Sequence, residues 1–398
     1  MIIFATFLLT RTLNPLQSFN RERARKLRYA TIACDIAVQA LPFQGGPEMS
    51  AVKIGLLMPR SGLAGLWTPS TDATAAIAVA ELNAEGGILG DEVDLTVADC
   101  GLTIGEAVTA ADFLLEVEDV DAVVGLHTSN VRDAISARLA GRVPYIYSVQ
   151  YEGVRCGPST VATGSVDHEI LWPAINWLMD SKHAERFYFV GNDYIWPRSA
   201  LELTKTLIAQ RGAHLVGQAF APLSDVDHSG IIDDIVRQRP HVVIQMLIGQ
   251  AAIDFNRAFS ERGLDTKMLR FGLAIDDTVL CGIGAENSHN LYAGGSYFSS
   301  WRSGPNERFL ELYHEAFGAY APPVSAMGVS AYEGINVVAG LARKAGGYNG
   351  RKMAGMLRRP MSRAVARHAL ARSPIGEVPH THIAAADGVV FNIVSSTQ

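Results

Sequence analysis

From residue 51 onward, short apolar runs alternate with longer stretches that have helical spacing. The runs "VKIGLLM", "VDLTVAD", "DAVVGL" and "VPYIYS" indicate buried strands, and a second series follows in "RFYFVG", "HLVGQAF", "HVVIQML" and "KMLRFGL". Helices are expected between them over residues 70–85, 104–117, 129–140, 197–210, 230–238 and 250–262. Such alternation predicts right-handed βαβ units and sheets covered on both faces. We therefore expect an α/β protein with two doubly wound parallel-sheet lobes.

The later part of the chain contains too few strands for a third lobe. It holds "LYAGGSYFSS", helices expected over residues 306–320 and 324–345, and a final strand in "DGVVFNIV". The chain is therefore expected to return and complete the two lobes already begun. Lobe 1 is predicted to comprise residues 50–164 plus 297–370, and lobe 2 residues 165–296 plus 371–398. Several crossings would join the lobes as a hinge.

Residues 1–48 differ from the rest and are interpreted as an N-terminal extension. They carry six basic and three acidic residues, which is a net charge of +3. Because the whole chain has a net charge of −6, the remaining residues carry −9. Residues 22–40 have the basic start of a signal peptide, but Asp35 interrupts their apolar stretch. Met49, directly before the first strand, is an alternative start. The location is expected to be cytoplasmic with the start at Met49 and periplasmic with a signal peptide.

Composition and motifs give no indication of nucleic-acid binding, membrane binding or catalysis. The net charge of −6 and a pI of about 6.0 give no basic face for nucleic acid or an anionic membrane. The four cysteines are scattered and fit buried free thiols. There is no phosphate-binding glycine loop, no dinucleotide fingerprint and no nucleophile elbow. We expect no cofactor and no catalytic centre.

Two histidine groupings were weighed as chemical sites. His380 and His382 would place two imidazoles on one strand face, but zinc normally takes three or four ligands. His127, Ser129 and Asp133 are too close in sequence for the usual triad geometry. We therefore expect no metal site and no hydrolytic triad.

Polar and aromatic residues gather at the carboxyl ends of four predicted strands, where ligands bind in open α/β sheets. These residues are His127, Thr128, Ser129, Tyr147, Gln150, Tyr151, Glu152, Asp193, Tyr194, Trp196, Asp276 and Asp277. Each has a plainer explanation: Ser129 suits a helix cap, Asp193 and Asp277 suit helix starts, and a lone aromatic residue is often half-buried packing. Convergence of four such ends, two from each lobe, predicts a ligand pocket.

Six stretches resemble the type I periplasmic-binding fold, in the branch of urea- and short-chain-amide-binding proteins. They are "IGLLMPRSG", "ELNAEGGILG", "VVGLHTSNVRDA", "YSVQYEG", "FVGNDYIWPRS" and "GGSYFSS", in order across residues 52–345. The branch includes solute-binding proteins of ABC transporters and a cytoplasmic amide sensor that controls an amidase operon. The tail "SPIGEVPHTHIAAADG" looks shortened relative to that family.

The resemblance implies a set of pocket positions. Ser129, Tyr147, Tyr194 and Trp196 match such positions, and His127 stands where the sensor has an aromatic residue. Val149 and Gln150 match the form of the urea binders. With Asp276 from the strand-end argument, the expected ligand-binding residues are His127, Ser129, Tyr147, Val149, Gln150, Tyr194, Trp196 and Asp276.

Hydroxyls and rings without an evident arginine suit a small neutral ligand, so we expect an amide or urea to bridge the lobes and stabilise a closed form. The expected partner is an ABC permease, or a cytoplasmic RNA-binding antitermination regulator if the protein is a sensor. No direct nucleic-acid binding and no membrane span are expected, and a homo-oligomer is an open alternative. The main alternative function is a branched-chain amino-acid binding protein, and an amidase is a third.

Overall fold

The computed structural model describes residues 51–157, 159–224, 227–356, 362–364, 372–374 and 380–397. The extension predicted over residues 1–48, with its signal-peptide and start-site interpretations, lies outside these residues. Of the tail stretch "SPIGEVPHTHIAAADG", residues 375–379 also lie outside them.

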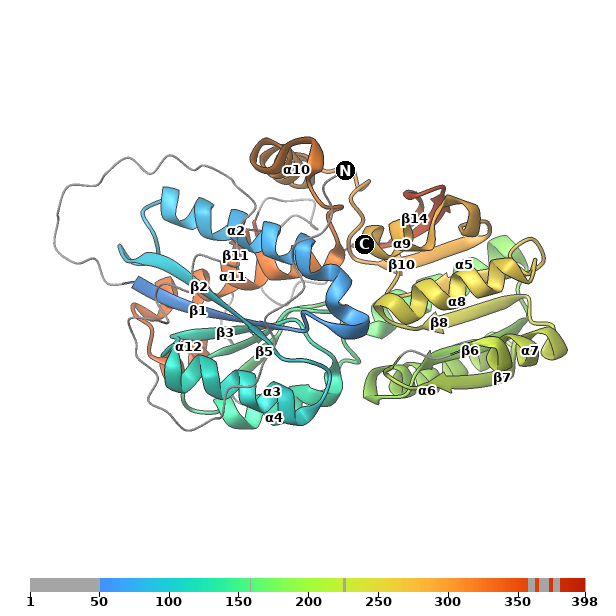
Figure 1. Ribbon diagram of the computed structural model, residues 1–398, viewed down its shortest axis with the longest axis horizontal. Coiled ribbons are helices and arrows are strands. Elements are labelled where there is room, and N and C mark those ends of the chain that lie inside the picture. The colour runs from blue at the N-terminus through green and yellow to red at the C-terminus, as the bar shows by residue number, and fades with distance from the viewer. Residues whose placement is uncertain are drawn as a thin grey trace, which may run out of the picture. The chain divides into compact units, whose positions relative to one another are not determined.

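A five-stranded parallel sheet forms the framework of the first lobe, in the order β2-β1-β3-β4-β5. Its strands are β1 (Ala51–Met58), β2 (Glu92–Asp99), β3 (Ala122–Gly125), β4 (Tyr145–Tyr147) and β5 (Thr160–Ala162). The helices that pack with it are α2 (Thr68–Ala84), α3 (Ile104–Asp112), α4 (Ser129–Leu139), α10 (Gly304–Phe317), α11 (Ala326–Ala345) and α12 (Gly350–Met356). Figure 1 shows α2 and α11 on one face of this sheet, and α3 and α4 on the other. Because both faces are covered, β3 is buried along its whole length.

A seven-stranded sheet forms the second lobe, in the order β14-β13-β10-β9-β8-β6-β7. Its strands are β6 (Arg186–Asn192), β7 (His214–Ala221), β8 (Val242–Met246), β9 (Leu269–Gly272), β10 (Leu291–Gly295), β13 (Thr381–Asp387) and β14 (Val390–Thr397). Its helices are α5 (Asp167–Lys182), α6 (Ile195–Gln210), α7 (Ser229–Gln238), α8 (Gly249–Glu261) and α9 (Asp277–Ile283). The strands from β6 to β10 pair in parallel, whereas β13 and β14 pair antiparallel. Residues 388–389 between β13 and β14 leave no room for a crossover helix, so these two strands form a hairpin.

The chain passes between the two sheets after β5, after β10 and again before β13. Between the last two passages, α10 and α11 return to pack against α2 beside the first sheet. A separate antiparallel pair, β11 (Ser362–Ala364) and β12 (Arg372–Pro374), follows α12. The structure therefore confirms the predicted fold class of two α/β lobes. The lobe boundaries placed at residues 164, 296 and 370 stay predictions.

The short helical turn η1 (Gly62–Trp67) departs from this division. It lies between β1 and α2, yet its Leu63, Ala64 and Trp67 are buried in the hydrophobic core of the second lobe. The turn packs against the start of α8, where Gly249 has a φ of +52° and a Cβ would lie 1.8 Å from the carbonyl oxygen of Leu63. Only glycine fits this approach without displacing backbone. A segment of the first lobe is thus packed into the second.

Candidate functional site

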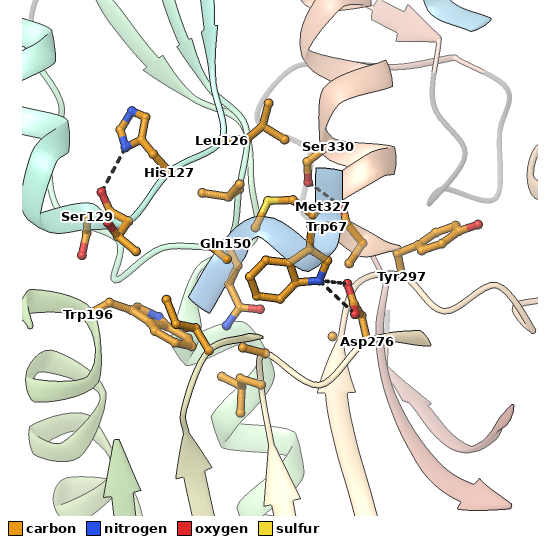
Figure 2. Close-up of a pocket in the computed structure, with 18 of the residues that line it drawn as sticks. Trp67, Leu126, His127, Ser129, Gln150, Trp196, Asp276, Tyr297, Met327 and Ser330 are labelled. Carbon is orange, nitrogen blue, oxygen red and sulfur yellow. Dashed lines mark hydrogen bonds between the residues drawn. The ribbon is translucent and has the colours of Figure 1, made fainter. Parts of the chain in front are cut away.

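A cavity of about 130 Å³ lies at the carboxyl ends of strands from both sheets (Figure 2). All eight residues expected to bind ligand line it: His127, Ser129, Tyr147, Val149, Gln150, Tyr194, Trp196 and Asp276. They follow β3, β4, β6 and β9 along the chain, so the strand-end rule brings together residues more than a hundred positions apart. Whether they bind ligand remains a prediction, developed below.

The amino-terminal end of α4 forms the hydrogen-bond donor end of the cavity. The N-cap Thr128 has extended backbone, and its side chain makes no capping bond. The hydroxyl oxygens of Thr128 and Ser129 are buried without a hydrogen-bond partner among the described residues. The first backbone N–H groups of a helix have no partner within the helix, and they favour a negative or carbonyl oxygen. This end is therefore suited to an acceptor group.

His127 is held as a neutral ring beside this end. Its Nδ1 lies 3.0 Å from the carbonyl oxygen of Thr128 and its Nε2 lies 2.5 Å from the hydroxyl of Tyr145. Burial lowers the pKa of His127 to about 4, and the nearby charge of Arg132 acts in the same direction. Both ring nitrogens are engaged away from Ser129, so His127 is not placed to activate that hydroxyl as a nucleophile.

Tyr147 and Tyr194 contribute aromatic surface and protonated hydroxyls. The Tyr147 hydroxyl donates to the carbonyl oxygen of His127 at 2.8 Å. Burial raises the pKa of both tyrosines, so both hydroxyls stay protonated at neutral pH. The ring of Tyr194 lies 6.3 Å from that of Trp196, measured between centroids. The contact between Tyr194 and Trp196 fixes the shape of the cavity wall that these two rings form.

Asp167, a buried carboxylate that does not line the cavity, accepts hydrogen bonds from two of the residues expected to bind ligand. Its Oδ1 accepts from Nε2 of Gln150 and from Nε1 of Trp196, each at 2.9 Å. Burial raises the pKa of Asp167 to about 7, against the opposing effect of these two hydrogen bonds. Asp167 is the first residue of α5, a helix that the strand pattern did not predict.

Asp276 forms the hydrogen-bond acceptor end of the cavity and contacts Trp67, at the end of η1. Nε1 of Trp67 donates to both of its carboxylate oxygens, at 3.1 and 2.9 Å, and the backbone N–H of Val279 donates at 3.1 Å. Figure 2 shows the indole of Trp67 reaching across to Asp276. Burial raises the pKa of Asp276 to about 6, so the group is mostly ionised at neutral pH.

No lysine or arginine lines the cavity within the described part of the chain. The arginines nearest the expected site are engaged elsewhere: Arg132 forms a buried ion pair with Glu152 at 2.6 Å, and Arg198 pairs with Asp193 at 2.6 Å. Glu152 and Asp193, which the strand-end argument included, therefore serve ion pairs and do not line the cavity. Asp277 accepts from the hydroxyl of Ser299 instead.

Across the ranges described, no group of three or more His, Cys, Asp and Glu side chains is placed to bind a metal ion, and this includes His380 and His382. His382 contacts the Ser396 hydroxyl at 2.8 Å and lies 4.2 Å from the ring of Trp301. Cys100, Cys156 and Cys281 are free thiols, but only Cys100 is buried as expected, and Cys34 lies outside the described residues. None of the helices described has the length and apolarity needed to span a membrane.

Two α/β lobes that share one cavity at their strand ends define the class of two-lobed binding proteins. A family model described as periplasmic binding protein matches residues 51–395, most of the 398-residue chain. The chain therefore belongs to the periplasmic binding protein family.

Individual relatives are more distant. The Leu/Ile/Val-binding protein homolog 7 of Brucella abortus (strain 2308) is 27% identical over 242 residues, which are 57% of this chain and 60% of that protein. The chain thus spans about 60% of the length of this curated relative. The Leu/Ile/Val-binding protein BraC3 of Rhizobium johnstonii is 24% identical over 305 residues, 74% of this chain and 80% of that protein.

Solved structures share the fold at low identity. A solute-binding protein of an ABC transporter from Rhodopseudomonas palustris BisB5, in complex with 3,4-dihydroxybenzoic acid, has a TM-score of 0.78 at 19% identity, covering 87% of this chain and 97% of that chain. A leucine-binding protein from Thermotoga maritima MSB8 has a TM-score of 0.73 at 16% identity, covering 87% and 99%. None of the four proteins named here is described as an amide or urea binder.

Proposed function

We propose that the protein binds a small uncharged solute with a carboxamide or urea group, without transforming it. The observation that carries this proposal is the polarity of the cavity. Donors lie at the α4 end with Ser129, an acceptor lies at Asp276, and no basic side chain lines the cavity in the described ranges. An amide offers a carbonyl acceptor for the first end and N–H donors for the second.

The size and walls of the cavity suit such a solute. An engineered cavity of about 150 Å³ in another protein holds benzene, so about 130 Å³ admits an amide with a short apolar tail. Trp67 and Trp196 can cover the flat face of an amide or urea. Each well-placed hydrogen bond contributes about 1 kcal/mol, and an unmade one costs about 1–3 kcal/mol. Discrimination between ligands would come from the free-energy difference between a made and an unmade hydrogen bond.

A branched-chain amino acid is the second candidate. The same two ends could receive its carboxylate and its ammonium group, and curated relatives are named Leu/Ile/Val-binding proteins. One feature weighs against it: no basic side chain is available for the carboxylate in the described part of the cavity.

An aromatic carboxylate, as held by the structural neighbour from Rhodopseudomonas palustris, is less suited to this cavity. Its carboxylate would enter a cavity that contains ionised Asp276 and, in the described ranges, no basic side chain, and like charges in a low-dielectric space repel. Binding would favour protonated Asp276 and would weaken as the pH rises through about 6.

We further propose that the protein is the solute-binding component of an ABC transport system and pairs with a permease. The family supports a binding role over an amidase, and the neutral His127 with both nitrogens engaged offers no base for Ser129. The proteins named above include a transporter component and no regulatory sensor, which supports transport over sensing.

A ligand panel tests the proposal. The full chain is titrated at pH 7.5 with acetamide, propionamide, urea, leucine and benzoate, and binding is followed by calorimetry and by thermal unfolding. A ligand at a hundred times its Kd stabilises the folded state by about 2.7 kcal/mol, which raises Tm by several degrees. We expect this shift with at least one amide or urea.

The other outcomes separate the candidates. Stabilisation by leucine alone, or by benzoate alone, would overturn the amide proposal in favour of that ligand class. Release of ammonia on incubation with acetamide or urea would contradict a purely binding role.

A further inference from the structure

Asp167 joins the two walls of the cavity although it does not line the cavity itself. It stands at the start of α5, is 1% exposed, and accepts through a single oxygen, Oδ1, from Gln150 and from Trp196. Gln150 follows β4 of the first sheet, whereas Trp196 lies in α6 of the second lobe. One carboxylate oxygen thus fixes a cavity residue from each lobe.

The chemistry of this contact sets the direction of the Gln150 amide. A carboxylate oxygen accepts hydrogen bonds and cannot donate them, so the NH₂ group of Gln150 must face Asp167. The carbonyl oxygen of Gln150 is then at the opposite end of the planar amide. Figure 2 shows this oxygen on the side of Trp67 and Asp276, and the nitrogen on the side of Trp196. Gln150 therefore offers the cavity an acceptor.

This arrangement costs stability, which argues for a role beyond holding the fold. Asp167 is buried with only two donors, and its Oδ2 has no partner within the described ranges. Burying a carboxylate without full pairing is unfavourable. The raised pKa of about 7 does not weaken the directional argument, because a proton on Oδ2 leaves Oδ1 able to accept both bonds.

We propose that Asp167 is a positioning residue for ligand selection: through Gln150 it presents a second acceptor beside Asp276 and selects ligands with an N–H donor at that end. A primary amide satisfies both acceptors, whereas a ketone of the same shape leaves them unpaired. This inference rests on the proposed function, because it concerns the same cavity and the same ligand class.

The test compares propionamide with butanone, which replaces the NH₂ group by a methyl group. Their affinities are measured by calorimetry for the full chain and its variants. Wild type should prefer propionamide by about tenfold or more, since unmade hydrogen bonds are costly. Asp167→Ala should reduce this preference about tenfold, whereas Asp167→Asn, which keeps an oxygen acceptor of the same shape, should retain it. In a Gln150→Ala background, Asp167→Ala should change the preference no further.

Controls separate selection from folding. Asp277 is a matched residue, because it is also a buried aspartate at the start of a helix and does not line the cavity. Asp277→Ala should keep the preference of wild type. Should Asp167→Ala fail to fold, Gln150→Leu carries the test, because leucine has no N–H to give Asp167 and no oxygen to offer the cavity; the preference for propionamide should fall about tenfold.

The outcomes distinguish this inference from the proposed function. If wild type binds no member of the ligand panel, the proposed function fails and this inference fails with it. If wild type prefers propionamide and Asp167→Ala keeps the full preference, only the role of Asp167 is overturned. An unchanged preference for propionamide in Gln150→Leu would overturn it in the same way.

Discussion

Ionisable groups beside the cavity are buried, and their protonation is linked to folding. Asp167 has a pKa of about 7 and Asp276 a pKa of about 6, both raised by burial, whereas burial lowers the pKa of His127 to about 4. Between about pH 4 and 7 the folded protein retains protons on the aspartates that the unfolded chain has lost. Their contribution therefore makes the protein less stable as the pH rises, and His127 acts in the opposite direction.

Asp167→Asn should flatten the dependence of stability on pH. The substituted amide does not titrate, so the loss of stability attributable to Asp167 between about pH 4 and 7.5 disappears. Three pH units correspond to about 4 kcal/mol, an upper estimate for this group. Unfolding of wild type and variant by guanidinium chloride at several pH values gives the difference, in which Asp276 and His127 cancel. Two parallel profiles would show that Asp167 is not a buried acid of raised pKa.

At the scale of the element, η1 packs against the start of α8, and this close contact depends on the glycine at position 249. Gly249 has left-handed backbone and faces the carbonyl oxygen of Leu63 so closely that any side chain would displace it. The same turn carries Trp67 into the cavity. Packing of η1 on α8 therefore couples the fold of the second lobe to the shape of the site.

Gly249→Ala should lower both stability and ligand affinity. The left-handed backbone strain and the displaced backbone together cost about 2–4 kcal/mol, and the shifted η1 withdraws Trp67 from the cavity. The matched control is Gly212→Ala, because Gly212 also has positive φ (+75°) but no neighbour within 4 Å of a Cβ. It should lose only about 1 kcal/mol. Equal losses in Tm for the two variants would contradict the close approach at Gly249.

The strands that the sequence predicted well are short, nearly continuous apolar runs. Apolar runs such as β3 and β8 are buried on both faces, and the residues that follow parallel strands meet at one edge by topology alone. For this reason all eight expected site residues line one cavity although no pairwise signal connects them.

The sequence did not predict helix α5 or the cavity residue Trp67. Pro173 lies inside α5 and obscured a helix whose apolar residues 170, 171, 174, 175 and 178 do follow helical spacing. Asp167, at its start, was missed with it. The carboxyl end of β1 was not included among the strand ends, although the same rule applied to "GLAGLW" would have found Trp67.

At the scale of the whole molecule, the Trp67–Asp276 contact links segments 209 residues apart in the chain. Trp67 directly precedes α2, which packs with the first sheet, whereas Asp276 caps α9 of the second lobe. The contact therefore ties η1 to the second lobe beside the cavity, and a ligand can leave more easily when the tie is broken.

Trp67→Phe should accelerate ligand release. The ring is largely kept and the Nε1–H donor is lost, so Asp276 loses a charge-assisted hydrogen bond of about 1.5–3 kcal/mol. We expect the dissociation rate of a ligand identified by the panel to rise about tenfold in stopped-flow measurements, with a smaller change in association rate. Trp301→Phe, at a tryptophan that does not line the cavity, should leave both rates unchanged. An unaltered dissociation rate in Trp67→Phe would contradict the tie.

The same indole gives the protein an optical property. Of its five tryptophans, Trp67 and Trp196 both line the cavity, and each gives its N–H to a buried carboxylate. The emission of an indole responds to the polarity and charge around it, so filling the cavity should alter the intrinsic fluorescence of the unlabelled protein. Occupancy could then be followed by light alone, without a dye or a coupled assay.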